Sequence, residues 1–296
     1  MKTDAHPATG SVRASTNSAR IELRDLASRY DAFIVDVWGV LCDGRRSFPA
    51  AVATLGKLHD KGPVALLSNT ARRAVVLSSM LSKLGISRES YDVAITAGEI
   101  CHAVLRSGSW AQLTKTRSRR LFYIGPERDR GILEATDTHD CRAVEEASAI
   151  LCTGLLDRRP TVGSHRPLLE RGVSSGLPLI CANPDKHVWI GRSLVPCAGS
   201  LAELYEAMGG RVIRFGKPER VAYDVCLAGL GKLKSGISAE RVLTIGDGLE
   251  TDIAGAAAHG FASLLVGTGL TKEADLSISG TASQWQPTYT LPDLSW

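Results

Sequence analysis

The chain has 296 residues, 44% of them hydrophobic and 22% charged, which is typical of a folded protein with one large or two ordinary domains. Its 35 basic and 31 acidic residues leave a formal net charge of +4, too small and too dispersed to indicate a nucleic-acid partner. No run of 18 apolar residues is present, so no membrane span is expected. The 7 cysteines include no CxxC pair, which argues against zinc, and the absence of a secretory apolar segment favours a cytoplasmic location.

The first twenty residues, MKTDAHPATGSVRASTNSAR, are small and polar. Such a segment buries too little apolar surface to offset the entropy lost on ordering. We therefore predict a disordered tail over residues 1–20. Arg and Ser in this segment raise the alternative of a transit peptide, but the segment has almost no apolar face.

Beyond the tail, short apolar runs alternate with stretches of helical period. The runs end in small or polar residues and are AFIVDVW (32–38), PVALLSN (63–69), LFYIG (121–125), AILCTG (149–154), PLICANP (178–184), RVIRFGK (211–217), RVLTIGD (241–247) and ASLLVG (262–267). Runs that are apolar on both faces and alternate with helices indicate a parallel sheet covered on both sides. The predicted class is α/β.

Four of the predicted strands end in reactive side chains, namely Asp36, Ser68 with Asn69, Lys217 and Asp247. Ligands of open parallel sheets bind beyond the carboxyl ends of the strands. One polar residue after a strand is more often a turn former or helix cap. Four such ends together supply a nucleophile, a hydroxyl, a cation and a metal-binding acid. We therefore expect them to meet in one site.

The predicted strands between residues 121 and 184 carry no such set. They form an insertion between the second and third reactive strand ends, which favours a separate domain that closes over the site. The expected division is a core of residues 21–92 and 188–296 and an α/β cap of residues 93–187.

The four strand ends suit phosphoryl transfer. The Asp36 carboxylate can attack phosphorus to give an acyl phosphate, which water hydrolyses. Because carboxylate and phosphate repel, we expect a bridging Mg²⁺, held by Asp36, Asp247 and the carbonyl of Trp38. Ser68 and Asn69 can donate to phosphoryl oxygens, and Lys217 supplies positive charge to the transferring group.

Asp252 lies five residues after Asp247, in the first turn of the expected helix. One interpretation is an acid favoured by the helix dipole. The other is a residue of the metal site that accepts from a metal-bound water or from Lys217. Both interpretations stay open at this point.

The set DVWGV, LLSN, FGKP and GDGLETD, over about residues 28–275, resembles the haloacid dehalogenase superfamily of phosphotransferases. The insertion and the stretch CANPD at its end resemble class IIA, which includes pyridoxal phosphate, phosphoglycolate and nucleotide phosphatases. The resemblance implies a Rossmann-like core with a C2-type α/β cap, Mg²⁺ and an aspartyl-phosphate intermediate. It also implies a phosphatase of a small phosphorylated metabolite and a homodimer formed through the caps.

Two residues depart from the family pattern. Trp38 stands where family phosphatases usually have a second aspartate that transfers protons, a role typically worth about 10²–10⁴ in rate. Three outcomes stay open: Asp185 or His187 supplies the proton, the substrate has a good leaving group, or the protein only binds a phosphorylated ligand. Thr70 replaces a frequent asparagine, which affects substrate contacts; Asn69, Thr70, Asp185 and His187 are the predicted substrate-binding residues.

Two weaker motifs are assigned to structure. The Asp-Gly pair at Asp43 is typical of a tight turn, and we interpret Asp43 as a turn residue of a small flap. GVSSG (172–176) matches G-x-S-x-G, but that motif needs a strand before it and a helix after it, and here the order is reversed. The identity of the substrate stays open among sugar phosphates, nucleotides, cofactor phosphates and phosphoglycolate-like acids.

Overall fold

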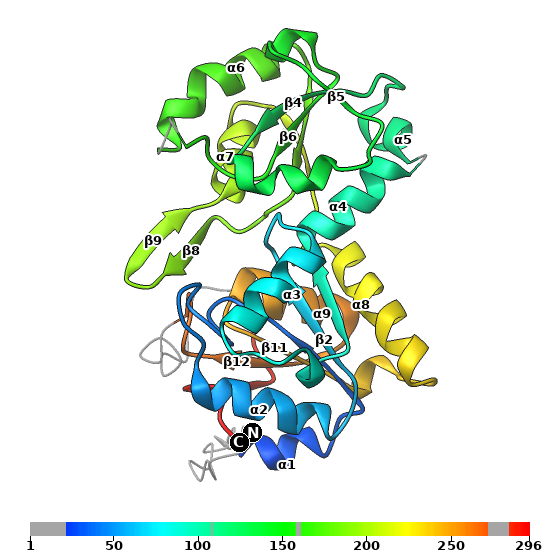
Figure 1. Ribbon diagram of the computed structural model, residues 1–296, viewed down its shortest axis with the longest axis vertical. Helices are drawn as coiled ribbons and strands as arrows, with labels where there is room; N and C mark the ends of the chain where they lie inside the picture. The colour runs from blue at the N-terminus through cyan, green and yellow to red at the C-terminus, as the bar shows by residue number, and fades with distance from the viewer. Residues whose placement is uncertain (1–21, 108, 158–160, 272–283) are drawn as a thin grey trace, which may run out of the picture.

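The computed structural model describes residues 22–107, 109–157, 161–271 and 284–296. The predicted tail of residues 1–20 lies outside these residues. Figure 1 shows two α/β parts, one above the other. In the described residues, no helix combines the length and the apolar character that a membrane span requires.

The lower part, the core, contains a six-stranded sheet with the order β13-β12-β11-β1-β2-β3, and every pair in it is parallel. The prediction of an α/β fold with a parallel sheet is confirmed. The strands are β1 (Ala32–Val35), β2 (Val64–Ser68), β3 (Val93–Thr96), β11 (Val242–Gly246), β12 (Ala262–Val266) and β13 (Tyr289–Leu291).

Alternate residues of the strands pack on opposite faces of this sheet, because successive side chains point to opposite sides. Phe33 and Val35 join the cluster formed with helices α1 (Leu23–Ala27), α2 (Pro49–His59) and α3 (Ala74–Lys83). Ala32 and Ile34 join the cluster formed with α8 (Arg220–Leu233) and α9 (Ala254–His259). Both faces are therefore buried, as the continuously apolar runs predict.

The upper part, the cap, contains a second parallel sheet with the order β10-β7-β6-β4-β5. Its strands are β4 (Arg120–Ile124), β5 (His139–Asp140), β6 (Ala149–Cys152), β7 (Pro178–Cys181) and β10 (Arg211–Arg214). Its helices are α4 (Ala97–Arg106), α5 (Trp110–Thr114), α6 (Arg166–Ser174) and α7 (Ala198–Ala207). An inserted α/β cap, as expected, thus follows the first three core strands.

Sheet membership does not follow the predicted domain boundaries at residues 92 and 187. The strand β3 pairs with β2 in the core sheet, and β10 pairs with β7 in the cap sheet. The segment GVSSG begins within α6 and precedes β7, so it lacks the strand–turn–helix context of a serine nucleophile. Short helical turns complete the fold: η1 (Arg88–Ser90), η2 (Glu127–Leu133), η3 (Val144–Glu146), η4 (Gly163–His165), η5 (Ala239–Arg241) and the π-helical turn η6 (Leu249–Ile253).

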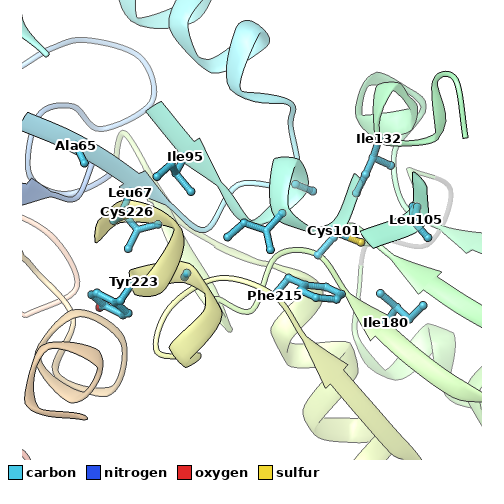
Figure 2. Packing of buried hydrophobic residues seen from close by; sticks show 14 of the residues in the cluster. Ala65, Leu67, Ile95, Cys101, Leu105, Ile132, Ile180, Phe215, Tyr223 and Cys226 are labelled. Carbon is cyan, nitrogen blue, oxygen red and sulfur yellow. The ribbon is translucent and has the colours of Figure 1, made fainter. Parts of the chain in front are cut away.

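One hydrophobic cluster runs from the core into the cap. Figure 2 shows Leu67 and Ile95 on the core side, Ile180 on the cap side, and Phe215 and Cys101 between them. All five side chains are at most 5% exposed. The two parts of the chain are therefore joined by packed side chains as well as by the connecting backbone.

A two-stranded antiparallel hairpin, β8 (His187–Ile190) and β9 (Ser193–Pro196), projects from the cap toward the core. In Figure 1 it lies between the two sheets, at the edge of the molecule. At its tip, the Gly191 N–H donates to the Asp43 carbonyl at 3.2 Å. The hairpin thus contacts the loop after β1.

Candidate active site

The central strands of the core sheet place three predicted side chains beside one another. Asp36 directly follows β1, Ser68 is the last residue of β2, and Asp247 directly follows β11. Because β11, β1 and β2 are parallel neighbours, their carboxyl ends lie at one edge of the sheet, about 4.8 Å apart. The Asp36 N–H continues the ladder by donating to the Ile245 carbonyl at 2.8 Å.

Lys217 reaches the site from a different sheet than the sequence predicts. It follows β10 of the cap, so it is not a strand end of the core. Gly216 before it has φ +109°, and a Cβ at this position would lie 2.5 Å from Asn69 Oδ1. A glycine is required here, because it allows the chain to turn close against Asn69.

Asn69 fixes the backbone of Lys217 rather than leaving its amide free for phosphate. Its Oδ1 accepts the Lys217 N–H at 2.7 Å, and its Nδ2 donates to the Lys217 carbonyl at 3.1 Å. The same Nδ2 donates to Asp185 Oδ1 at 2.7 Å. Both N–H groups of the amide are therefore engaged within the protein, and Asn69 links the end of β2 to two segments that return from the cap.

The Lys217 ammonium lies between two carboxylates. Its Nζ donates to Asp36 Oδ1 and, at 2.8 Å, to Asp252 Oδ1. The three side chains are 7% exposed or less. Burial alone would lower the pKa of Lys217, but the carboxylates of Asp252 and Asp36 outweigh burial and raise it. Lys217 therefore stays charged at neutral pH.

The carboxylates of Asp36, Asp247 and Asp252 each offer an oxygen, and these oxygens lie within 4.8 Å of one another. Burial raises the pKa of Asp36 well above its ordinary value, against the opposing effect of Lys217. Burial, together with the Asp252 charge, raises the pKa of Asp247 to about 7. When all three acids are ionised beside one ammonium, they leave an excess of buried negative charge, which a divalent cation with oxygen ligands would balance. The arrangement fits Mg²⁺.

The other contacts of these acids show which oxygens are already engaged. Asp247 Oδ2 accepts the Leu270 N–H at 2.5 Å, which orients the carboxylate. Asp252 Oδ2 accepts the Gly248 N–H at 3.3 Å and the Thr251 hydroxyl at 3.1 Å. Within the described part of the chain, no hydrogen bond is accepted by the Trp38 carbonyl, so this oxygen can serve a cation.

Asp252 lies in the π-helical turn η6, which directly follows the loop after β11. The hydroxyl of Tyr223 in α8 donates to the carbonyls of Thr251 and Asp252 at 3.2 and 3.3 Å. Gly255 allows this contact, because a Cβ there would lie 2.3 Å from the Tyr223 hydroxyl oxygen. Tyr223 thus holds the turn that aims Asp252 at Lys217. The sequence analysis did not single out Tyr223, because its position in the helix pattern is that of an ordinary buried residue.

A cavity of about 550 Å³ lies between the core and the cap hairpin, and all ten residues predicted for the site line it. The Ser68 hydroxyl oxygen accepts the Thr70 N–H at 3.3 Å, which joins the last residue of β2 to the turn that follows it. Asp185 is partly buried at the return from the cap, and burial raises its pKa. His187 is exposed at the start of β8.

The flap residue Asp43 lies in a turn, as its Asp-Gly pair predicts. Its Oδ1 accepts the N–H groups of Arg45 and Arg46, each at 2.9 Å, and Gly44 has φ +81°. The hydrogen bonds to these two N–H groups lower the pKa of Asp43 against a raising effect of burial, so it stays ionised. Sequence reasoning also missed the segment Thr268–Leu270, which lines the cavity and supplies a backbone N–H to Asp247.

Comparison with known proteins identifies the family. A profile of haloacid dehalogenase-like hydrolases matches residues 33–139, and a second, HAD-hydrolase-like profile matches residues 214–296. The crystal structure of a haloacid dehalogenase-like hydrolase from Brucella suis 1330 is 34% identical, covers 92% of this chain and 98% of its own, and superposes with a TM-score of 0.80. The chain belongs to the haloacid dehalogenase-like hydrolase family.

Curated relatives of the family align over most of the chain. D-glycerol 3-phosphate phosphatase of Mycobacterium tuberculosis is 26% identical over 271 residues, which are 91% of this chain and 69% of that protein. The 5'-nucleotidase YutF of Bacillus subtilis is 25% identical over 90% of this chain and 96% of that protein. The glycerol phosphate phosphatase structure from M. tuberculosis in complex with magnesium is 25% identical, covers 90% of this chain and 77% of its own, and has a TM-score of 0.66.

Proposed function

We propose that the protein is a Mg²⁺-dependent phosphatase that hydrolyses the phosphate monoester of a small metabolite. The observation that carries this proposal is the buried contact of Lys217 with Asp36 and Asp252 at the edge of the cavity. A fixed ammonium and a carboxylate nucleophile side by side suit the transfer of a charged phosphoryl group. The phosphatase and nucleotidase names of the relatives support the same activity.

The positions of the side chains in the site suggest a role for each of them. Asp36 is the nucleophile, Ser68 orients a phosphoryl oxygen, and Lys217 neutralises the phosphoryl group as it transfers. Asp36, Asp247 and the Trp38 carbonyl would hold the cation, which would bring the phosphate beside the nucleophile and screen its charge.

Asp252 completes this arrangement chiefly through Lys217. Because one of its oxygens accepts from Lys217 and the other from Gly248 and Thr251, we propose that it positions the ammonium and adds charge to the cation site. Asn69 has a similar positioning role, since it holds the Lys217 backbone. Thr70, Asp185 and His187 line the cavity and would contact the substrate.

Trp38 supports a second candidate function. Its indole offers only an N–H donor, so it cannot transfer protons as a carboxyl group does. Within the cap, Asp185 is held by Asn69 and His187 is exposed, and neither shares a hydrogen bond with Asp36. A protein with this set of contacts can bind a phosphorylated ligand but hydrolyse it only slowly. Its function would then be to bind the ligand.

A steady-state assay with a generic aryl phosphate separates the two candidates. For the phosphatase we expect turnover that requires Mg²⁺, stops in EDTA, and is abolished in Asp36→Asn. Asp43→Asn is the matched control, because this carboxylate lies in the flap turn and an amide oxygen can accept the same two N–H groups. Tight binding of phosphate without turnover by the wild type would support the binding protein instead.

A further inference from the structure

The cavity is larger than a phosphoryl group requires, and apolar side chains form part of its lining. Its volume of about 550 Å³ lies within the roughly 300–1,000 Å³ of pockets that enclose small ligands. The carboxylates of Asp36, Asp247 and Asp252 lie together with Lys217 in this cavity, so the alcohol portion of an ester would occupy the rest of it. Apolar side chains line it from both sides: Trp38, Phe48 and Leu270 from the core, and Val188, Trp189 and Ile190 from the hairpin.

Trp38 is held in place as a wall of this cavity. Its backbone forms a bridge with Cys42, and its side chain packs against the cluster on the α1–α3 face of the core sheet. The flap turn closes on its nitrogen edge: a Cβ on Gly44 would lie 2.7 Å from Trp38 Nε1. The indole is only partly buried, and its remaining surface lines the cavity beside the nucleophile strand. An aromatic surface thus stands ready before any ligand binds.

Resting on the proposed phosphatase function, we propose that the alcohol portion of the substrate is a flat aromatic ring that stacks on Trp38 beneath the β8–β9 hairpin. Aromatic rings gain from stacked or edge-to-face contact with an indole in addition to the apolar area that they bury. A saturated ring of similar size buries similar area but lacks this gain. The cap hairpin, whose tip is joined to the flap by the Gly191–Asp43 hydrogen bond, closes the opposite side.

Trp38 also favours a phosphate ester whose alcohol is a good leaving group. A bond forms between an Asp36 oxygen and phosphorus as the ester P–O bond breaks, and the aryloxide departs with the bonding electron pair. The aryloxide then takes a proton from water, and a second water hydrolyses the acyl phosphate to release phosphate and restore Asp36. Because a phenolic hydroxyl has a pKa of about 10, this departure needs no acid from the protein, whereas an alkoxide does. Trp38 therefore suits aryl esters in both shape and chemistry.

Binding of two phosphonates tests the recognition without any turnover. Benzylphosphonate and cyclohexylmethylphosphonate have the same acid group and a six-membered ring, and neither is an ester. By calorimetry with the full chain and Mg²⁺, we expect benzylphosphonate to bind about 3–10-fold more tightly to the wild type. The preference should persist in Trp38→Phe and vanish in Trp38→Leu. Equal dissociation constants of the two phosphonates for the wild type would overturn the proposal, whatever the variants bind.

Kinetics with two esters test the chemistry. We expect kcat/KM for phenyl phosphate to exceed that for benzyl phosphate by about 10² or more, and Trp38→Asp to narrow the ratio by accelerating the benzyl ester. Preferential binding of benzylphosphonate without turnover of either ester would overturn the proposed phosphatase and retain the aromatic recognition. Turnover of both esters with equal phosphonate affinities would overturn the recognition and retain the phosphatase.

Discussion

The raised pKa of Asp247 makes the stability of the metal-free protein depend on pH. Burial, reinforced by the Asp252 charge, raises this pKa to about 7, whereas an aspartate in an unfolded chain titrates near about 4. Between these values the folded protein keeps a proton that the unfolded chain has lost. The stabilisation from this group is complete below about pH 4 and is lost as the pH rises to about 7.

The expected loss is large compared with the stability of a typical domain. A displacement of about three pKa units corresponds to about 4 kcal/mol in the free energy of unfolding, and about 3 kcal/mol of it falls between pH 5 and pH 8. Mg²⁺ should offset this loss at pH 8, because it would bind the ionised carboxylates of the folded state. At about 100 times its dissociation constant, the ion would add about 2.7 kcal/mol.

Urea unfolding in EDTA at several pH values between 5 and 8 measures the effect. The matched variant is Asp247→Asn, whose amide oxygen can still accept the Leu270 N–H while the titrating group is removed. We expect the wild type to lose about 3 kcal/mol more than the variant across this range, and Mg²⁺ to stabilise the wild type far more than the variant. Parallel pH profiles of the two proteins, or equal stabilisation by Mg²⁺, would refute the buried-charge argument.

Three further substitutions test the packing around the site. Lys217→Met leaves the buried carboxylates of Asp36 and Asp252 without their ammonium. The free energy of unfolding in EDTA at pH 8 should therefore fall by about 3–5 kcal/mol. An unchanged free energy would contradict the pairing. Asn69→Ala removes the hydrogen bonds that fix the Lys217 backbone. We expect the free energy of unfolding in urea to fall by about 2–3 kcal/mol and kcat to fall as well. A normal kcat would exclude the positioning role. Leu66→Ala opens a cavity at a fully buried position of β2 and should cost about 2–5 kcal/mol, with no change in the pH profile of activity.

The strand ends were the part of the site that sequence could predict. Buried parallel strands have a distinctive apolar pattern, and a parallel sheet must bring its carboxyl ends to one edge, so Asp36, Ser68 and Asp247 follow from pattern alone. Lys217 was predicted at the site but on the wrong sheet. The strand before it, β10, has two apolar residues between two arginines, and nothing in such a local pattern says which of two parallel sheets a strand joins.

Contacts made by backbone groups and by ordinary core residues could not be predicted. Asp247 is oriented by the backbone N–H of Leu270, and every non-proline residue has such a group. Tyr223 occupies a buried helix position that looks like any other in the sequence. The contacts of Asn69 with the cap segments could not be predicted either, because the sequence shows an amide near the nucleophile but not the segments to which its Nδ2 donates. These contacts depend on long-range packing, which sequence periodicity does not record.

Trapping the phosphorylated protein tests the central claim most directly. The full chain is mixed with a ³²P-labelled aryl phosphate and Mg²⁺, quenched in acid within the first turnover, and digested to locate the label by mass spectrometry. The buried group of Asp36, Lys217 and Asp252 predicts an acid-stable, hydroxylamine-sensitive acyl phosphate on Asp36 that requires Mg²⁺ and is absent from Asp36→Asn. Label on another residue, or label that persists in Asp36→Asn, would contradict the account.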